Sequence, residues 1–293
     1  MSCDPAMNTS PPTEAKSKAV VTLVDRSPTL LLARTLERQV MAELGLDRRA
    51  ARRLIHDLVA RCQLAYRVDL GHTFIGLAHD KPRRIGGRIV IVPQGQRWLP
   101  DPGEAVVTLQ RGIAFGYGSH ATTLLCLKGL AWLMPAGPSS QPAARSRLCD
   151  VGTGSGSLAL AGLKLGVATA LASDTDPCAR YEARANAQLN DLSGRIAIRA
   201  DALGQNDGQF DLILANLRWP TLSQIRRVFS ECLKKGGALV VSGLRPEEAG
   251  QLVGAYQRLG LACVWQGECG DWSGVVFRYV DGMTGVLQND PDR

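Results

Sequence analysis

Leu148-Cys149-Asp150-Val151-Gly152-Thr153-Gly154-Ser155-Gly156-Ser157 is the stretch that decides the fold of this chain. Apolar residues lead into an acid and then into three glycines, and an Ala/Leu-rich helical pattern follows up to Gly166. We therefore predict a strand, a tight turn and a helix start. Glycines tolerate positive φ and let a ligand approach the backbone, and the first N–H groups of a helix lack helical partners. The pattern predicts a ligand-binding turn.

A second strand that ends in an acid supports this interpretation. Residues 168–174 are predicted to form a strand that runs into Asp174, 22 residues after Gly152. In doubly wound nucleotide-binding folds, a carboxylate about 20 residues beyond the glycine turn binds ribose hydroxyls. The predicted fold class is therefore α/β, with a doubly wound, mostly parallel sheet of seven strands that closes with a hairpin around Trp265–Tyr279.

Two kinds of ligand compete for such a turn. Dinucleotide-binding turns follow Gly-x-Gly-x-x-Gly and place a pyrophosphate over the helix N-terminus. Here the third glycine comes one residue early, and Asp150 would repel a pyrophosphate but suit an α-ammonium group. Residues 150–156 therefore resemble the first motif of class I methyltransferases that use S-adenosylmethionine (SAM), with a Rossmann-like fold. NAD binding and a purely structural turn are the alternatives.

Length and composition bound the class of protein. The 293 residues are 45% hydrophobic and 21% charged, and about 100–200 residues per domain suggests two domains. No apolar run reaches the roughly 18 residues of a transmembrane helix, and the N-terminus has no secretory signal pattern. Eight cysteines without a Cys-x-x-Cys and four scattered histidines indicate neither a metal site nor disulfides. We expect a cytoplasmic protein without a metal or a membrane segment.

The N-terminal region differs from the rest of the chain. Residues 1–27 are predicted to be a disordered tail because they are rich in Ser, Pro, Thr and Lys. Residues 28–80 show two helical patterns separated by Gly45, with Asp47 as the cap of the second, and then a hairpin pattern. These features are typical of a small winged-helix-like domain.

The positive charge points to an acidic partner. The formal net charge of +7 is concentrated in residues 26–111, where Lys and Arg exceed Asp and Glu by seven. The exposed start of the second predicted helix carries Arg48, Arg49, Arg52 and Arg53. One interpretation is contact with nucleic acid. The other is a solvated helix face on a module that serves dimerisation or substrate gating, so a homodimer is a second expectation.

The remaining boundaries follow from pattern changes. Residues 81–111 are predicted to be a linker with a strand, residues 112–281 the SAM-binding catalytic domain, and residues 282–293 a flexible tail. Within the catalytic domain, a second glycine-rich segment precedes a helix over 124–133. Either of two neighbouring threonines is the predicted N-cap of that helix, Thr122 or Thr123.

Taken together, these motifs resemble the ribosomal protein L11 methyltransferase family, over about residues 85–280. The family transfers methyl groups from SAM to amino groups of a large-subunit ribosomal protein. The matching motifs occur in register: Phe-Gly-x-Gly-x-His-x-Thr-Thr at 115–123, Asp-Val-Gly-x-Gly-Ser-Gly at 150–156, Ser-Asp-Thr-Asp-Pro at 173–177, Ala-Asn-Leu at 215–217, Leu-Lys-Lys-Gly-Gly at 233–237, Ser-Gly-Leu at 242–244 and Asp271-Trp272.

The resemblance implies a set of cofactor contacts. Asp150 is expected beneath the methionyl moiety, Asp174 at the ribose hydroxyls and Asp201 at the adenine amino group. The alternative for Asp201 is a turn residue. The other expected cofactor contacts are the glycines of the turn and the side chains of the preceding segment: Gly152, Gly154, Gly156, Phe115, His120, Thr123 and Asn216. A hydrogen bond that merely holds its own loop is the alternative role for His120.

Asn216 and Trp219 are the predicted catalytic residues. Amino-group methyltransferases commonly carry Asn/Asp-Pro-Pro-aromatic after a buried strand, and these two residues have the matching spacing without the first prolines. The Asn carbonyl would accept from the target N–H, and the aromatic ring would pack on the substrate or plug the loop.

Three departures from the family bear on the substrate. Arg218-Trp219 replaces small residues, Tyr117 replaces a threonine, and the N-terminal domain is unlike the family's own. We predict N-methylation of a protein side chain, with a ribosomal protein as an expected partner. Methylation of a small molecule or RNA, or a SAM-binding nucleic-acid regulator, are the alternatives.

Overall fold

The computed structural model describes residues 14–27, 31–60, 64–69, 72–77, 82–110, 112, 114–118, 120–134 and 145–279. The chain divides into two compact units, residues 1–80 and 81–293. The predicted tail 282–293 lies outside the described residues, as do residues 1–13 of the predicted N-terminal tail.

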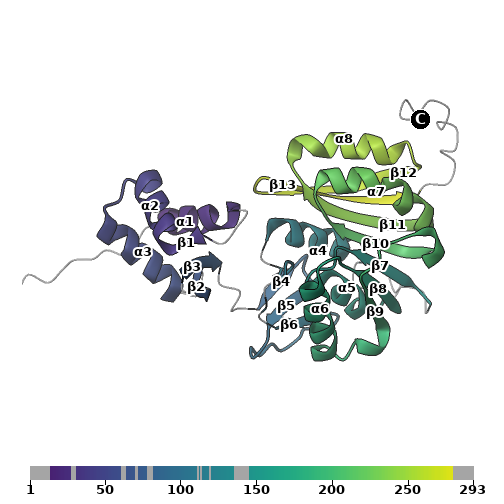
Figure 1. The fold of residues 1–293 in the computed structure, drawn as a ribbon, viewed down its shortest axis with the longest axis horizontal. Coiled ribbons are helices and arrows are strands. Elements are labelled where there is room, and N and C mark those ends of the chain that lie inside the picture. Colours follow the sequence, from purple (N-terminus) through teal and green to yellow (C-terminus); the bar gives the residue numbers. More distant parts are fainter. Residues whose placement is uncertain are drawn as a thin grey trace, which may run out of the picture. The chain divides into compact units, whose positions relative to one another are not determined.

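The first unit combines helices with a small antiparallel sheet (Figure 1). In this sheet β3 lies between β1 and β2. A turn at Gly45 and a cap at Asp47, whose Oδ1 accepts from Ala50 N at 2.7 Å, are present as predicted. The winged-helix assignment itself stays a prediction. The elements in order are α1 (Glu14–Arg26), β1 (Leu31–Leu32), α2 (Ala33–Leu44), α3 (Arg48–Ala60), β2 (Leu64–Asp69) and β3 (His72–Leu77).

Helix α1 corrects the prediction that residues 1–27 form a disordered tail. Residues 14–26 are helical, and Val20 and Val24 are 0% and 7% exposed. Both pack into the core of the first unit with Leu36 and Leu54. Composition is a poor guide here, because most helical stability in proteins comes from burying one apolar face rather than from propensity.

The second unit contains the predicted seven-stranded sheet, with the order β12-β13-β11-β10-β7-β8-β9. All neighbouring strands run parallel except at β13, which is antiparallel to both of its neighbours. The α/β prediction and the closing hairpin are therefore confirmed. The elements are β7 (Arg147–Val151), α5 (Ser157–Lys164), β8 (Thr169–Ser173), α6 (Pro177–Leu189), β9 (Ile196–Arg199), β10 (Phe210–Asn216), α7 (Trp219–Cys232), β11 (Leu233–Leu244), α8 (Pro246–Gln257), β12 (Leu261–Cys269) and β13 (Trp272–Tyr279).

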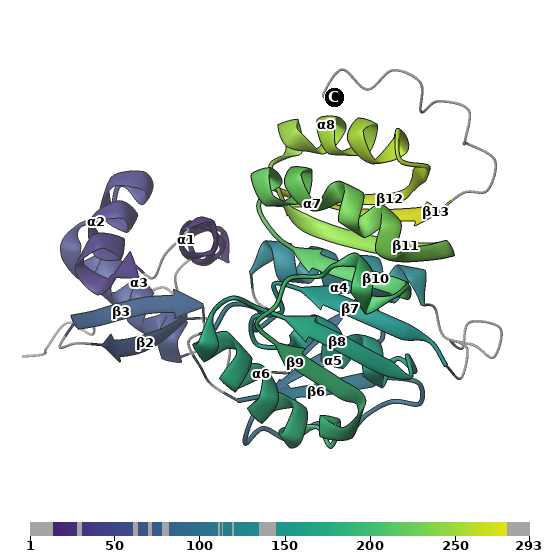
Figure 2. The same ribbon diagram turned by 45° about the vertical axis from the view of Figure 1, so that its right-hand side comes forward.

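Both faces of this sheet are buried, as parallel sheets require. Alternate residues of each strand enter different cores: Leu148 and Leu214 pack in one, Cys149 and Ile213 in the other. Helices α7 and α8 cover the second core, and α5 and α6 lie on the opposite side of the sheet (Figure 2). The first core is also covered by α4 (Ala121–Leu133). The strand ends between these layers are where a site forms in such folds.

The predicted linker 81–111 is instead part of the second unit. It forms a sheet of β4 (Arg83–Ile85), β5 (Ile89–Pro93) and β6 (Ala105–Leu109). Apolar side chains of these strands share the core with α4 and α5. Asn190 of α6 accepts from Thr108 N at 2.8 Å and donates to Thr108 O at 2.6 Å. The strands are short and separated by a Pro/Gly stretch, which in the sequence is typical of a linker. Their packing against a core becomes visible only in the structure.

Candidate active site

The glycine turn after β7 has the backbone that the sequence predicted. Gly152, Gly154 and Gly156 have φ values of 74°, 55° and 85°. The N–H of Gly152 donates to Ser173 O at 2.9 Å, which ties the turn to the end of β8. A Cβ on Gly154 would lie 2.3 Å from the carbonyl oxygen of Phe115. Position 154 therefore has no room for a side chain, and α5 begins at Ser157, directly after the turn.

Asp174 lies beside this turn. Its Oδ2 accepts from Gly154 N at 2.8 Å, and its Oδ1 accepts from Asp176 N at 3.0 Å. Each carboxylate oxygen keeps a further lone pair, so the half-buried Asp174 can still accept from two hydroxyls. Asp176 is the N-cap of α6, because its Oδ1 accepts from Cys178 N at 2.8 Å.

Asp150 is wholly buried below the turn. Its Oδ2 accepts from Thr153 Oγ1 at 2.6 Å and from Ala159 N at 3.2 Å, whereas its Oδ1 has no hydrogen-bond partner among the described residues. Burial raises the pKa of Asp150 to about 7, against the opposing effect of these hydrogen bonds. A buried acceptor without a partner is costly, so this oxygen marks a place for a donor.

The segment before α4 is fastened to the turn. Phe115 O accepts from Ser155 N at 2.8 Å. His120, rather than Thr122 or Thr123, is the N-cap of α4, and its Nδ1 accepts from Thr122 N at 3.3 Å. The predicted cap is therefore wrong, because an imidazole nitrogen takes the acceptor role usually filled by a hydroxyl. The His120 ring meets Phe115 edge-on, with centroids 5.0 Å apart.

Asn216 ends β10 and faces the same helix. Its Nδ2 donates to Thr123 Oγ1 at 3.3 Å, and Thr123 is fully buried. The donor side of the amide is thereby held by α4, which leaves Oδ1 as the acceptor on the other side. The structure thus joins two of the predicted site residues, 93 positions apart in the chain.

Trp219 and Asp201 are not joined to this group by any contact of the described residues. Trp219 is the first residue of α7 and packs partly against the core under α7 and α8. Asp201 is exposed, and its backbone carbonyl accepts from Arg199 Nε at 3.2 Å. The roles assigned to both side chains stay predictions.

The structure brings a further aromatic residue, Trp272, next to His120 at this site. It begins β13, and its ring centroid lies 5.5 Å from that of His120. The guanidinium carbons of Arg218 and Arg245 lie 5.1 and 4.4 Å from its ring centre. Asp271-Trp272 was recognised in the sequence as a motif, but nothing in the local pattern indicates which residues it would meet.

Helix α6 supplies a further group that the sequence analysis missed. Glu182 Oε2 accepts from Ala114 N at 3.0 Å. Asn186 donates to Ser155 O and accepts from Gln110 N, both at 2.8 Å. In the sequence, polar residues recur at helical spacing at positions 182, 186 and 190. In the structure, all three are buried. These hydrogen bonds of α6 hold the glycine turn against the segment before α4.

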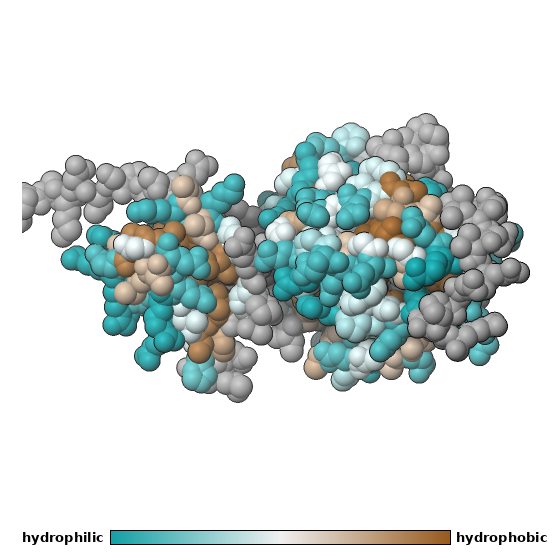
Figure 3. Space-filling view, turned by 90° about the horizontal axis from the view of Figure 1, so that it is seen from above, coloured by the Kyte–Doolittle hydropathy of each residue, from teal (hydrophilic) through white to brown (hydrophobic). Residues whose placement is uncertain are grey.

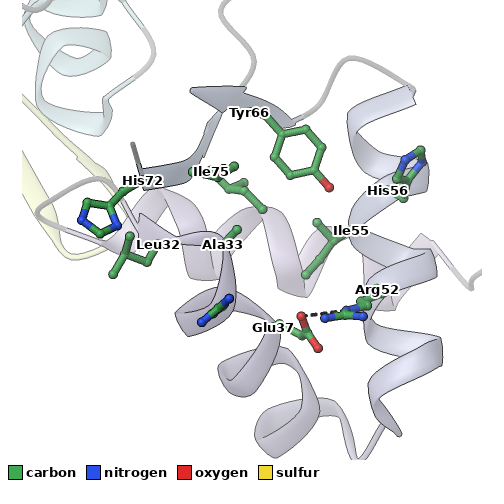
Figure 4. A pocket seen from close by; sticks show the side chains of 11 residues that line it. Leu32, Ala33, Glu37, Arg52, Ile55, His56, Tyr66, His72 and Ile75 are labelled. Carbon is green, nitrogen blue, oxygen red and sulfur yellow. Dashed lines mark hydrogen bonds and ion pairs between the residues drawn. The ribbon is translucent and has the colours of Figure 1, made fainter. Parts of the chain in front are cut away.

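In the first unit, Glu37 changes the interpretation of the arginine cluster. This buried carboxylate binds Arg48 Nε at 2.6 Å and Arg52 Nε at 3.0 Å; Figure 4 shows its pair with Arg52. Burial alone would raise the pKa of Glu37, but hydrogen bonds from the two arginines lower it. Arg49 and Arg53 are exposed on α3, so half of the predicted arginines are held by Glu37, which offsets one of the four positive charges.

The Glu37–Arg52 pair borders a hollow of the first unit. Figure 4 shows Tyr66, His56 and His72 around it. Leu32 and Tyr66 line this hollow and are 41% and 45% exposed. Figure 3 shows hydrophobic side chains among hydrophilic ones on one face of this unit.

None of the helices in the described ranges is long and apolar enough to cross a membrane.

Comparison with known proteins matches the second unit to one family. The family model "Ribosomal protein L11 methyltransferase (PrmA)" matches residues 77–279. The ribosomal protein L11 methyltransferases of Syntrophotalea carbinolica and Geobacter sulfurreducens are 41% and 36% identical, over 62% and 68% of this chain. The chain spans 58% and 63% of the length of these two relatives.

A solved structure gives the same result for the fold. The ribosomal protein L11 methylase of Lactobacillus delbrueckii subsp. bulgaricus superposes with a TM-score of 0.58 at 28% identity. The match covers 67% of this chain and 97% of that structure. Fold and family agree over the unit that carries the glycine turn.

Proposed function

Since the chain belongs to the ribosomal protein L11 methyltransferase family, we propose that it transfers methyl groups from SAM to an amino group of a protein. Ribosomal protein L11 is the first candidate acceptor, because the relatives carry that name. A ribosomal substrate would place the reaction in the cytoplasm. The observation that carries the proposal is the glycine turn whose Gly154 N–H donates to the carboxylate of Asp174.

The residues around the turn fit SAM. Asp174 would bind the ribose hydroxyls through its remaining lone pairs, and the turn without side chains would let the cofactor approach the backbone. The unpartnered Oδ1 of buried Asp150 matches a cationic donor such as the α-ammonium group of the methionyl part. A pyrophosphate offers no donor to that oxygen. When bound, SAM supplies a methyl group attached to a positively charged sulfur.

The chain has to present an unprotonated amine to that methyl group. Asn216 Oδ1 would accept an N–H of the amine, and the bond from Asn216 to Thr123 keeps the amide in one orientation. Alignment of reacting atoms accounts for a large part of the rate in such transfers. Removing a lysine amine from water lowers its pKa and favours the neutral form. We assign no side chain as a general base.

Nucleic acid and a second subunit are weaker candidates as partners. Glu37 pairs with both Arg48 and Arg52 and offsets one positive charge, so α3 retains an excess of three of its four arginine charges for phosphates. Binding through three charges would weaken with salt by a slope of about three in logarithmic units. Homodimer formation stays a prediction.

Calorimetric titration of SAM into the full chain tests the proposal. Asp174→Ala removes hydrogen bonds to a charged acceptor, so we expect affinity to fall about ten- to hundredfold, or ~1.5–3 kcal/mol. Asp176→Asn is the control, because it removes a neighbouring charge and retains a good helix cap. Failure of the intact protein to bind SAM would overturn the proposal. Transfer of labelled methyl groups to ribosomal protein L11 tests the acceptor.

A further inference from the structure

A cationic cluster lies where the acceptor has to enter, and this inference rests on the proposed function. We define the acceptor-side cluster as Arg218, Arg245 and Trp272. In the sheet register Asn216 pairs with Ser242 of β11, and Leu244 pairs with Ser273 of β13. The ends of β10 and β11 and the start of β13 therefore meet at one edge of the sheet. The proposed acceptor contact, Asn216, lies at that same edge.

One cation of this cluster has carboxylates beside it and the other has none: the backbone N–H of Arg245 donates to Glu248 Oε2 at 2.7 Å. Arg245 donates to Asp271 O at 3.3 Å and lies 3.8 Å from Asp271 Oδ2. Arg218 is exposed, and within the part of the chain that the structure describes no carboxylate is paired with it. The guanidinium carbon of Arg218 lies 5.1 Å from the centre of the Trp272 ring. Arg218 is thus the cation of the cluster without an acidic partner among the described residues, and it stands two residues from Asn216.

This charge has a consequence for an incoming lysine. The field of Arg218 would repel a cationic lysine on its approach unless other groups of the substrate compensate. An acceptor segment that carries carboxylates beside its lysine removes this repulsion, because Arg218 can bind a carboxylate with paired N–H donors.

We infer that Arg218 is a specificity-determining residue, and that the preferred acceptor is a lysine flanked by acidic residues in a polypeptide. The indole of Trp272 holds the two guanidinium groups by cation–π contact, which limits their freedom before the substrate arrives. Pre-ordered charges lose less entropy on binding. Phosphate would satisfy the same cations, so RNA is the competing ligand that the experiment has to separate.

The test compares two synthetic peptides of equal length in which one lysine is flanked either by glutamates or by glutamines. Each is titrated calorimetrically into the full chain saturated with S-adenosylhomocysteine, so turnover is not needed. We expect the glutamate peptide to bind at least tenfold more tightly at low salt. Arg218→Glu should abolish this preference, and Arg218→Lys should retain part of it.

Arg258→Glu is the matched control. It changes the net charge by the same amount but lies just beyond the far end of α8 from Arg245. Equal binding of both peptides, binding of neither, loss of the preference in Arg258→Glu, or tighter Arg218-dependent binding of a uridine oligonucleotide would each overturn the inference. Unchanged binding of S-adenosylhomocysteine to Arg218→Glu separates these results from a failure of the proposed function, in which the intact protein would bind no cofactor.

Discussion

At the scale of single residues, Asp150 couples the site to pH. Folding raises its pKa from 3.8 to about 7, chiefly by burial, with a smaller contribution from the charge of Asp174. A carboxyl whose pKa is raised in the folded state binds its proton more tightly there than in the unfolded chain. Its favourable contribution to stability is complete below about pH 4 and is lost as the pH rises through 7.

We therefore expect the free energy of unfolding of the cofactor-free protein to fall between pH 5 and 8, and Asp150→Asn to reduce that fall by about 3 kcal/mol. The asparagine keeps an acceptor for Thr153 but cannot ionise. Urea unfolding of both proteins at pH 5, 6.5 and 8 measures the difference. Parallel pH profiles for the two proteins would show that Asp150 ionises normally.

A methyl group at position 154 should have a local and large effect. Gly154→Ala brings a Cβ to within 2.3 Å of Phe115 O at a positive φ, so the turn or the segment before α4 must move. We expect a loss of about 2–4 kcal/mol in stability and loss of SAM binding. Gly194→Ala is the control, since that Cβ would meet nothing within 4 Å. Equal melting temperatures for the two variants would contradict the geometry.

At the scale of elements, α6 acts as the clamp of the site. Asn186 is fully buried and serves one carbonyl and one N–H in two separate segments, Ser155 and Gln110. Removal of its amide leaves both groups buried without partners, which costs about 1–3 kcal/mol for each group. The helix thereby connects the stability of the unit to the position of the glycine turn.

Asn186→Leu is expected to lower stability by about 2–5 kcal/mol and to weaken SAM binding, because the turn loses its support. The variant keeps the helical propensity of α6, so circular dichroism should change little. Gln188→Ala, on the exposed face of the same helix, provides the comparison. A variant that is destabilised but binds SAM with unchanged affinity would limit Asn186 to a purely structural role.

At the scale of the whole molecule, the two units have separate cores. The residues of the first core all lie before residue 80, and those of the two other cores all lie after residue 81. The family match begins at residue 77, so the first unit lies almost wholly outside it. The first unit is thus separable in principle from the unit that carries the glycine turn.

A chain of residues 82–293 should therefore fold and bind SAM with the affinity of the full chain. Calorimetry and thermal unfolding of both lengths check this, with a single transition expected for the shortened chain. Any change confined to methyl transfer would assign the first unit to the acceptor. A shortened chain that aggregates or loses SAM affinity would show that the units depend on each other.

The sequence by itself determined the features that depend on neighbours along the chain. Three glycines at a spacing of two specify a turn with positive φ, alternating apolar residues specify buried strands, and the motifs in register indicate the family. These signals are local, so the α/β fold, the turn at 152–156 and the position of Asp174 were predicted correctly.

Only the tertiary structure decided which distant groups meet. Residues 14–26 became a helix because a core formed with residues between 36 and 75 buries their apolar face, and 82–110 became a sheet because α4, α5 and α6 cover it. The same applies to His120 as a cap, to Trp272 beside Arg218 and Arg245, and to Glu37 beneath two arginines. The physical reason is that burial, pairing of charges and the pKa of Asp150 depend on contacts between segments, which no local periodicity encodes.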